Sequence, residues 1–497
     1  MKKTVIIISI ILLLFLIVGS IYLIYYITQQ NIEKPPKGEY EEKITEKADE
    51  LFDGKEKDKT EINLDSKKET THLSKVADTK DAYWVRGADL VWNDIENRQG
   101  KFDWEFMDEI VKRSSSESNG EVYYLSIIWP YANWDQDACH TGDKYLATGH
   151  LKRGDEDLKM GAPCDMQAYG NFVKKAVERY DGDGIDDMPD LKIPIKYWEI
   201  INEPSMQGGS EGGAGEDLKF FVGTSEEYLE ILKTSYQSIK EADSEAKVLP
   251  AGMAGMMNNF LEFWDPIFEA GGGQYFDIAN MHTISTREDR EDLFMLKFNK
   301  YLEKYGLQDK PVWLTEVEFY GLMEKPDDLK AFERLMVRSS VFALASGADK
   351  LFYIENWLFW DQMGPGIMIE EKPEEDMMEE KEMKDDEEKF SPNKELLNGS
   401  THRVYLNLIN KLNEFDKVET IKEEYIENAD DNAGATSKVG QYKFISGEKE
   451  VYVLWGQSDL PEELSGEATI TNIYGDSEKK SVEDIVLGDE PVFVEKF

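Results

Sequence analysis

The sequence alternates short strand-like runs with helical stretches, and this alternation limits the architectures open to the chain. The β-rich runs occupy residues 84–91, 122–129, 195–202, 247–250, 276–282, 312–316 and 350–354. Stretches with helical periodicity lie between them, at residues 104–113, 169–180, 226–242, 293–305 and 328–346. Strand–helix repetition over this length predicts a parallel β-sheet covered by helices. The pattern by itself leaves open whether that sheet is open or closed.

The pattern changes towards the C-terminus. After about Glu419 the helical stretches stop, and strand-like alternation follows at residues 450–454, 467–473 and 491–495. Alternation of period two without intervening helices predicts a small antiparallel β domain. We therefore place the strand–helix body at 76–412 and a β-sandwich-like domain at 413–497. Within the body, Thr224 followed by Glu227 predicts a capping box at the start of one helix.

Two motifs at strand ends favour the closed form. The string WEIINEP at 198–204 ends one strand, and PVWLTE at 311–316 ends another. The two strings resemble the fourth-strand and seventh-strand signatures of the clan A (β/α)8 glycoside hydrolases. The resemblance also takes in WNDIE at 92–96 and GKFDW at 100–104, and it covers roughly residues 82–410. It implies a (β/α)8 TIM barrel followed by a small accessory β domain.

The resemblance assigns a pair of carboxyl groups to catalysis. Cleavage of a glycosidic bond passes through an oxocarbenium-like state, which needs one protonated carboxyl at the leaving oxygen and one ionised carboxylate beneath the anomeric carbon. In the family the acid/base is the strand-four glutamate, which falls on Glu203, and the nucleophile is the strand-seven glutamate, which falls on Glu316. Clan A enzymes are retaining, so the two carboxyls are expected about 5 to 5.5 Å apart.

Four further residues take substrate-binding or supporting roles by the same resemblance. Arg86, at the end of a strand, is expected to hydrogen-bond the nucleophile and keep it ionised. Asn202 is expected to hold the sugar 2-hydroxyl, and His282 to orient this network. An aromatic residue of the eighth strand, Trp357 or alternatively Trp360, is expected to form the stacking floor for the sugar.

Some features depart from the family pattern or leave an assignment open. Glu318 competes with Glu316 for the nucleophile role, because residues i and i+2 share one face of a strand. Many clan members have Tyr after the sixth-strand histidine, whereas this chain has Thr283. The hydrogen bond to the nucleophile that this Tyr would make is then either missing or supplied by Tyr320. The first barrel strand is expected in the polar stretch at 60–64, which makes closure there uncertain.

Two loops invite hypotheses about cross-links and ions. Cys139 and Cys164 flank a long excursion after the third strand and are expected to form a disulfide outside the cell; two free thiols, or a zinc site with His140 and His150, are the alternatives.

A second loop, DGDGIDD at 181–187, has closely spaced carboxylates. Asp181, Asp183 and Asp187 suit a structural calcium ion, although the loop fails the EF-hand pattern, and a plain acidic turn is the alternative.

The N-terminal region carries a targeting signal. Lys2 and Lys3 precede an uncharged run at 4–27, which at about 1.5 Å per residue is long enough to cross the roughly 30 Å hydrocarbon core of a bilayer. We expect a transmembrane anchor at 1–30 with its short end in the cytoplasm, or a cleaved signal peptide with Val18 and Ser20 at the cleavage site, which would make the protein secreted.

Two highly charged segments are expected to be solvated. Residues 31–75 are rich in Glu and Lys and read as a tether between anchor and body, and an acidic insertion at about 370–389 reads as a surface loop.

Composition excludes several classes of function. Lys plus Arg number 57 against 101 Asp plus Glu, a net charge of −44 that would repel a phosphate backbone, so no nucleic-acid partner is expected. The five histidines contain no His-Glu-x-x-His pattern, so a catalytic zinc is not indicated.

The sequence therefore predicts a membrane-anchored, extracellular retaining glycoside hydrolase that cleaves O-glycosidic bonds, with β-linkages expected, in an oligo- or polysaccharide and requires no cofactor. An inactive glycan-binding barrel of the cell envelope and a transglycosylase using the same site are the alternative hypotheses.

Overall fold

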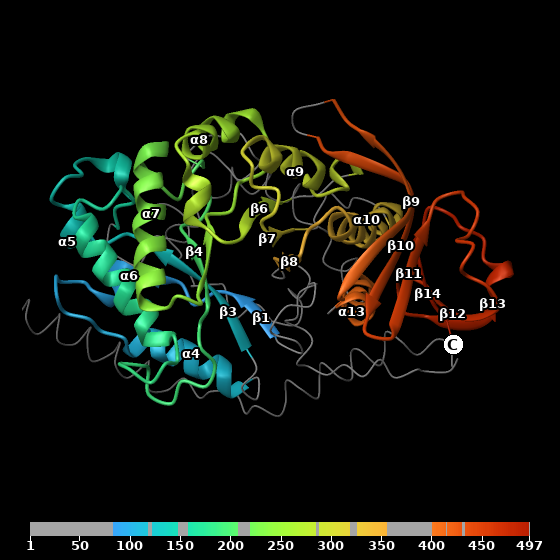
Figure 1. Ribbon diagram of the computed structural model, residues 1–497, viewed down its shortest axis with the longest axis horizontal. Coiled ribbons are helices and arrows are strands. Elements are labelled where there is room, and N and C mark those ends of the chain that lie inside the picture. Colours follow the sequence, from blue (N-terminus) through green and yellow to red (C-terminus); the bar gives the residue numbers. More distant parts are fainter. Residues whose placement is uncertain are drawn as a thin grey trace, which may run out of the picture. The chain divides into compact units, whose positions relative to one another are not determined.

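The computed structural model describes residues 83–117, 122–147, 158–206, 219–284, 288–318, 326–354, 400–413, 415–429 and 433–496 (Figure 1). The expected anchor, tether, first barrel strand and acidic insertion all lie outside these ranges. Across the described residues, no helix is both long enough and apolar enough to span a membrane.

Parallel strands in two sheets form the centre of the body. The first sheet has the order β1-β3-β4-β5, with β2 also paired to β3, and the second has the order β6-β7-β8. An isolated parallel bridge between Met253 and Met281 links the residues after β5 to β6. The bounds of the strands are β1 Tyr83–Arg86, β2 Leu90–Val91, β3 Val122–Trp129, β4 Tyr197–Ile200, β5 Lys247–Pro250, β6 Ala279–Thr283, β7 Val312–Val317 and β8 Lys350–Tyr353. The predicted combination of parallel strands and alternating helices is confirmed.

The single strand expected at 84–91 is wrong. The chain forms β1 and the short β2 instead, with Ala88 between them in the left-handed region at φ 57°. That conformation interrupts the extended backbone, and Leu90 and Val91 then pair with Ile128 and Trp129 at the far end of β3.

Helices separate the strands, and α6, α7 and α8 are neighbours in chain order and in space (Figure 1). The longer helices are α4 Glu105–Glu117, α6 Met166–Tyr180, α7 Ser225–Ala242, α8 Asn258–Glu269, α9 Met295–Lys304, α10 Pro326–Ala345 and α13 Ser400–Leu412. Shorter pieces are α3 Trp92–Ile95, α5 Asn133–Gln136, and the 3₁₀ turns η2 Asp143–Tyr145, η4 Gly272–Tyr275, η5 Glu288–Arg290 and η7 Val482–Asp484. The predicted capping box is present: Thr224 Oγ1 accepts from the backbone N–H of Glu227, whose carboxylate accepts from the N–H of Thr224.

One cluster of buried side chains joins both parallel sheets. Its members are Trp84, Leu125, Leu249, Ile278, Trp313 and Phe352. Ring centroids of Trp84 on β1 and Phe352 on β8 are 6.4 Å apart, so side chains from the outermost strands of the two sheets meet in this cluster. The Lys350 ammonium lies 3.4 Å from the centroid of the Trp84 ring, a cation–π contact inside this cluster.

The C-terminal part is a six-stranded antiparallel sheet of order β13-β12-β14-β11-β10-β9. Its strands are β9 Lys417–Glu427, β10 Ala435–Ser446, β11 Lys449–Trp455, β12 Glu467–Thr471, β13 Ser477–Ser481 and β14 Val492–Lys496. The predicted antiparallel β-structure is confirmed, and in the described residues all six strands belong to one sheet. Arg338 of α10 forms an ion pair with Glu291 and donates to the carbonyl of Ser437 on β10, which links the sheet to the helical body.

Candidate active site

The strand ends collect charged side chains at one place. Arg86 ends β1, Glu199 lies within β4, and Glu316 lies near the end of β7. Asn202 and Glu203 follow β4 directly, and His282 is on β6. Contacts through Arg86 and His282 link all six, so residues from both parallel sheets form one cluster. In parallel α/β proteins the carboxyl ends of the strands are the usual location of ligand sites.

Arg86 is the centre of the charged network. Its Nε and Nη2 donate to the two oxygens of Glu199 at 2.8 and 2.9 Å, in a two-pronged arrangement. Nη1 donates to Glu316 at 2.6 Å, and Nη2 also donates to Asn202 Oδ1 at 2.7 Å. Burial lowers the pKa of Arg86, but Glu199 and Glu316 more than offset it, and the net pKa is raised. The guanidinium therefore stays charged and neutralises carboxylates from two strands.

Glu203 and Glu316 lie on either side of His282. The Nδ1 atom of His282 is 2.8 Å from Glu203 Oε1 and 3.6 Å from Glu316 Oε2. One ring nitrogen and one oxygen of each glutamate all lie within 4.8 Å of one another. The His282 and Glu203 side chains are almost completely buried, whereas the Glu316 side chain keeps 15% of its surface exposed.

The two glutamates have different electrostatic environments. Burial raises the pKa of Glu203 to about 7; the field of Arg86 opposes this rise and that of Glu199 adds to it. Burial also raises the pKa of Glu316, but His282, when its ring is protonated, and Arg86 act against it, and Arg86 does so through a direct hydrogen bond. Burial lowers the pKa of His282, so the ring is neutral at neutral pH. Glu203 thus faces a neutral ring, and Glu316 faces a cation.

An irregularity in β7 places two consecutive side chains against His282. Met281 pairs with Leu314, but His282 pairs with Glu316, so Thr315 is an extra residue on β7. Thr315 Oγ1 lies 2.8 Å from His282 Nε2, and Glu316 lies on the Nδ1 side of the same ring. A bulge of this kind changes the direction of a side chain without displacing the strand.

Glu318, the competing nucleophile, has different surroundings. Its backbone N–H donates to the carbonyl of Thr283 at 3.0 Å. Burial, reinforced by the charge of Glu316, raises the pKa of its side chain to about 7. Of these two glutamates, Glu316 is the one to which Arg86 donates, at 2.6 Å. Thr283, the residue after His282, donates its hydroxyl to the carbonyl of Leu293.

The backbone after β4 adopts unusual angles. Ile201 has φ 66° and Glu203 has φ 32°, both in the region that non-glycine residues rarely occupy. For the β-branched Ile201 this conformation costs of the order of 1–3 kcal/mol, which the surrounding structure must offset. The turn directs Asn202 towards Arg86 and Glu203 towards His282. Stored strain next to charged side chains is typical of functional sites.

Sequence reasoning missed four members of this cluster. Glu199, fully buried, accepts both prongs of Arg86 and the backbone N–H of Gly252 at 3.2 Å. A Cβ atom at Gly252 would lie 1.9 Å from His282 Nε2, so only glycine leaves room for the ring. Thr315 contacts His282 Nε2, and Asn280 Oδ1 in turn accepts from the Thr315 hydroxyl. The available signal was polar residues in otherwise apolar strands, since a buried polar group needs a partner.

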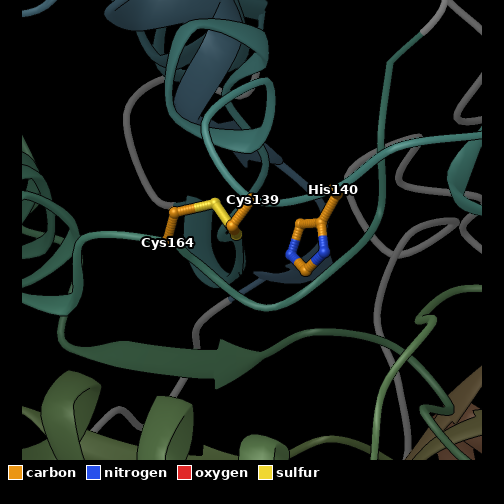
Figure 2. Close-up of side chains that lie close together, drawn as sticks. All are labelled: Cys139, His140 and Cys164. Carbon is orange, nitrogen blue, oxygen red and sulfur yellow. A yellow bond between two sulfur atoms is a disulfide. The ribbon is translucent and has the colours of Figure 1, made fainter.

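The loop after β3 contains a disulfide between Cys139 and Cys164 (Figure 2). The His140 ring lies beside it, as Figure 2 shows, and its Nε2 is 2.6 Å from the carbonyl oxygen of Ala162. Asp135 anchors the far side of the bridge by accepting from the N–H groups of Cys164 and Asp165. With its sulfurs bonded to each other, the pair has no thiolate to offer zinc; His150 lies outside the described residues.

The acidic loop after α6 brings its carboxylates together. Oxygens of Asp181, Asp183 and Asp187 lie within 4.8 Å of one another. All three also accept backbone N–H groups of the same loop, including those of Gly182 and Gly184. Burial raises the pKa of Asp181 to about 6, against the opposing effect of the hydrogen bond from the Asp183 backbone N–H. Calcium binding here stays a prediction, as does the alternative of an acidic turn.

The predicted sugar-stacking residue Trp357, its alternative Trp360, and Tyr320 lie outside the described residues. Their roles stay predictions. Arg86, Asn202, Glu203, His282 and Glu316 are the predicted residues that the structure brings together.

Comparisons with known proteins give low similarity. No protein-family model and no curated protein matches the chain. Among solved structures, a glycoside hydrolase family 30 endoxylanase from Clostridium papyrosolvens is 11% identical, with 86% of this chain and 98% of that chain covered and a TM-score of 0.44. A family 44 xyloglucanase from Paenibacillus polymyxa is 10% identical, with 86% and 97% covered and a TM-score of 0.42. A structure of BuGH86wt in complex with neoagarooctaose is 11% identical, with 83% and 69% covered and a TM-score of 0.45.

Proposed function

We propose that this chain is a retaining glycoside hydrolase with Glu316 as nucleophile and Glu203 as acid/base. The observation that carries the proposal is the spacing of these two carboxyls, of which Glu203 is buried and Glu316 is partly exposed; one oxygen of each lies within 4.8 Å of the other. Retaining enzymes hold their carboxyls about 5–5.5 Å apart, whereas inverting enzymes leave about 6.5–9.5 Å for a water molecule. The proposal includes a closed (β/α)8 barrel whose first strand lies outside the described residues.

The charges around the pair fit this division of roles. Glu316 accepts a hydrogen bond from Arg86 and is the more exposed of the two, which suits an ionised group that must reach a sugar carbon. Glu203 has a pKa of about 7 and can carry a proton at neutral pH. An ionised Glu316 beside the anomeric carbon stabilises a cationic oxocarbenium-like transition state.

The reaction proceeds in two displacements. In the first, Glu316 attacks the anomeric carbon while Glu203 gives its proton to the leaving oxygen, and a covalent glycosyl–enzyme ester forms. In the second, ionised Glu203 removes a proton from water, the water oxygen attacks the same carbon, and the Glu316 carboxylate is released. Asn202, held by Arg86, is placed to bind the sugar hydroxyl next to the anomeric carbon.

Chemical rescue with azide can distinguish the roles of the two glutamates. Glu203→Ala is expected to form the covalent intermediate from substrates whose leaving group needs no proton, and azide should restore turnover and give a glycosyl azide of retained configuration. Glu316→Ala lacks the nucleophile, so azide should attack directly and give inverted product. The assay is a panel of aryl glycosides and polysaccharides with the product configuration determined by NMR.

Glu318→Ala is the matched control, because Glu318 is a neighbouring buried carboxyl of the same chain segment. Glu318→Ala should still hydrolyse substrates with retention of configuration, provided that circular dichroism shows all three variants to be folded. Loss of activity in Glu318→Ala together with near-normal retaining activity in Glu316→Ala would assign the nucleophile to Glu318. Equal inactivity of the unmodified chain and both catalytic variants across the panel would favour the inactive glycan-binding alternative.

We further propose that a membrane anchor holds the protein at the cell surface and that the protein acts outside the cell. The support is the uncharged run at 4–27 with its preceding lysines, together with a disulfide, which persists in oxidising compartments. The substrate is an oligo- or polysaccharide, since the charged cluster is suited to a glycosidic bond.

A further inference from the structure

A chain of buried polar side chains leads away from the candidate acid, and each of its members has a defined hydrogen-bonding role. It runs from Pro250 at the end of β5 through Asn280 on β6, Thr315 on β7 and His282 on β6 to Glu203. Its separations are 3.1, 2.8, 2.8 and 2.8 Å in that order. The side chains of His282 and Glu203 are 1% and 6% exposed, and Asn280 and Thr315 are also buried, so water does not compete for their lone pairs.

The far end of the chain is fixed by a backbone carbonyl. The carbonyl oxygen of Pro250 can only accept, so the Asn280 amide must present its NH2 group to it. The Asn280 oxygen then faces Thr315 and can only accept. The single hydroxyl proton of Thr315 is therefore donated to Asn280 at 2.8 Å.

The hydroxyl direction determines which nitrogen of His282 carries the proton. With its own proton given to Asn280, the Thr315 oxygen can only accept from His282, so the ring proton is on Nε2. The ring is neutral and holds one ring N–H proton, which leaves a bare lone pair on Nδ1. That lone pair points at Glu203 Oε1 from 2.8 Å.

From this order of donors and acceptors we propose that Asn280 and Thr315 are positioning residues that fix the tautomer of His282 and thereby keep Glu203 protonated. A protonated Glu203 donates O–H to the Nδ1 lone pair, whereas an ionised Glu203 would place two lone pairs against each other. The opposite tautomer, with the proton on Nδ1, would donate to the carboxylate and favour its ionised form. The inference rests on the proposed function, because a general acid must carry a proton before it can donate one, and Glu203 is the proposed acid.

Other charges also act on this pair. Arg86 of β1 favours ionised Glu203, Glu199 of β4 disfavours it, and Glu316 of β7 acts on His282. Thr315 is uncharged, so a substitution at Thr315 leaves these three charged residues in place. It therefore tests the tautomer of His282 separately from their charges. Thr315→Val is nearly isosteric and removes only the hydroxyl, whereas Thr315→Ser keeps it.

The first test needs no substrate. Two-bond ¹H–¹⁵N NMR on the full-length chain labelled at histidine nitrogens reports the tautomer of each ring, and His282→Gln identifies its signals among the five histidines. We expect Nε2–H in the unmodified protein, a shift towards Nδ1–H in Thr315→Val, and Nε2–H again in Thr315→Ser. Nδ1–H in the unmodified protein would overturn the inference, whether or not the chain hydrolyses any glycan and whether or not Thr315→Val folds.

The second test is the pH profile of kcat/KM, whose alkaline limb reports deprotonation of the acid. Thr315→Val should move that limb to lower pH by about 1 pH unit, which lowers kcat/KM about fivefold at pH 7 and about tenfold well above it, while leaving the acidic limb in place. Thr315→Ser should return the limb towards its original position. A uniform loss of activity with an unmoved limb would mean that Thr315 only supports packing, and the inference would fail while the glycosidase proposal stood.

Discussion

Replacing Arg86 with methionine should destabilise the protein in a way that depends on pH. Arg86 donates four hydrogen bonds, three of them to carboxylates, and Glu199 at the receiving end is fully buried. Removing one partner of a buried ion pair costs about 3–5 kcal/mol, because the remaining charge is left without compensation. Methionine fills a similar volume, so the loss comes mainly from the charge and little from a cavity. We expect the free energy of unfolding to fall by about 3–5 kcal/mol at pH 7.

The sign of the pH dependence follows from the carboxyls that Arg86 leaves behind. Arg86 is one of the two groups that oppose the effect of burial on the pKa of Glu316, so its removal raises that folded-state pKa further above the unfolded value. A raised carboxyl pKa destabilises the fold above the unfolded pKa of about 4.3 and has no effect once both states are protonated. The difference between variant and unmodified protein should therefore shrink as the pH falls from 7 to 4.

Urea denaturation followed by tryptophan fluorescence at both pH values measures this difference. Lys174→Met is the control, since Lys174 pairs with Glu241 at the surface, with 43% and 69% of the two side chains exposed. The control should change stability by no more than about 1 kcal/mol at either pH. A loss below about 1 kcal/mol for Arg86→Met at pH 7, or an equal loss at pH 7 and pH 4, would refute the electrostatic reasoning.

Two further predictions concern other parts of the chain. Replacing Cys139 and Cys164 by serine opens a bridge with a sequence separation of 25 and should lower the free energy of unfolding by about 3 kcal/mol in urea denaturation, with reductant having no added effect; an unchanged midpoint would argue against a stabilising bridge. Protease added outside intact cells should release a fragment that begins in residues 31–75, and a mature native N-terminus at Ile21 would instead show a cleaved signal peptide.

The sequence predicts the order of elements well because local patterns determine it. Runs such as 312–316 and 247–250 have an apolar centre with a β-branched residue, and each forms a strand within about one residue of its expected bounds. The helix α8 at Asn258–Glu269 was missed, since it contains Pro266 and carries no polar cap at Met257. Its amphipathic pattern is satisfied by burial of Phe260 and Trp264, a tertiary contact that the local sequence does not express.

The candidate site was predictable only in part, for a similar reason. Glu203 and Glu316 stand in recognisable strings, but Thr315 enters the site only because of the bulge that pairs His282 with Glu316. Strict alternation of side chains would place Thr315 and Glu316 on opposite faces of β7. A bulge depends on the partner strand, and a single strand's sequence therefore gives no indication of it.

The difference between the two catalytic candidates comes from their neighbours and not from the glutamates themselves. Both are carboxyls in a buried cluster, and burial raises the pKa of each. Glu316 accepts a hydrogen bond from Nη1 of Arg86, and Nε and Nη2 of the same guanidinium donate to Glu199, which fixes its direction. Glu203 instead contacts Nδ1 of His282, and Thr315 fixes the orientation of that ring through Nε2. Each carboxyl thus contacts a group that is itself held by a second buried partner, and we expect a change in either outer partner to alter the pKa of the glutamate without touching it.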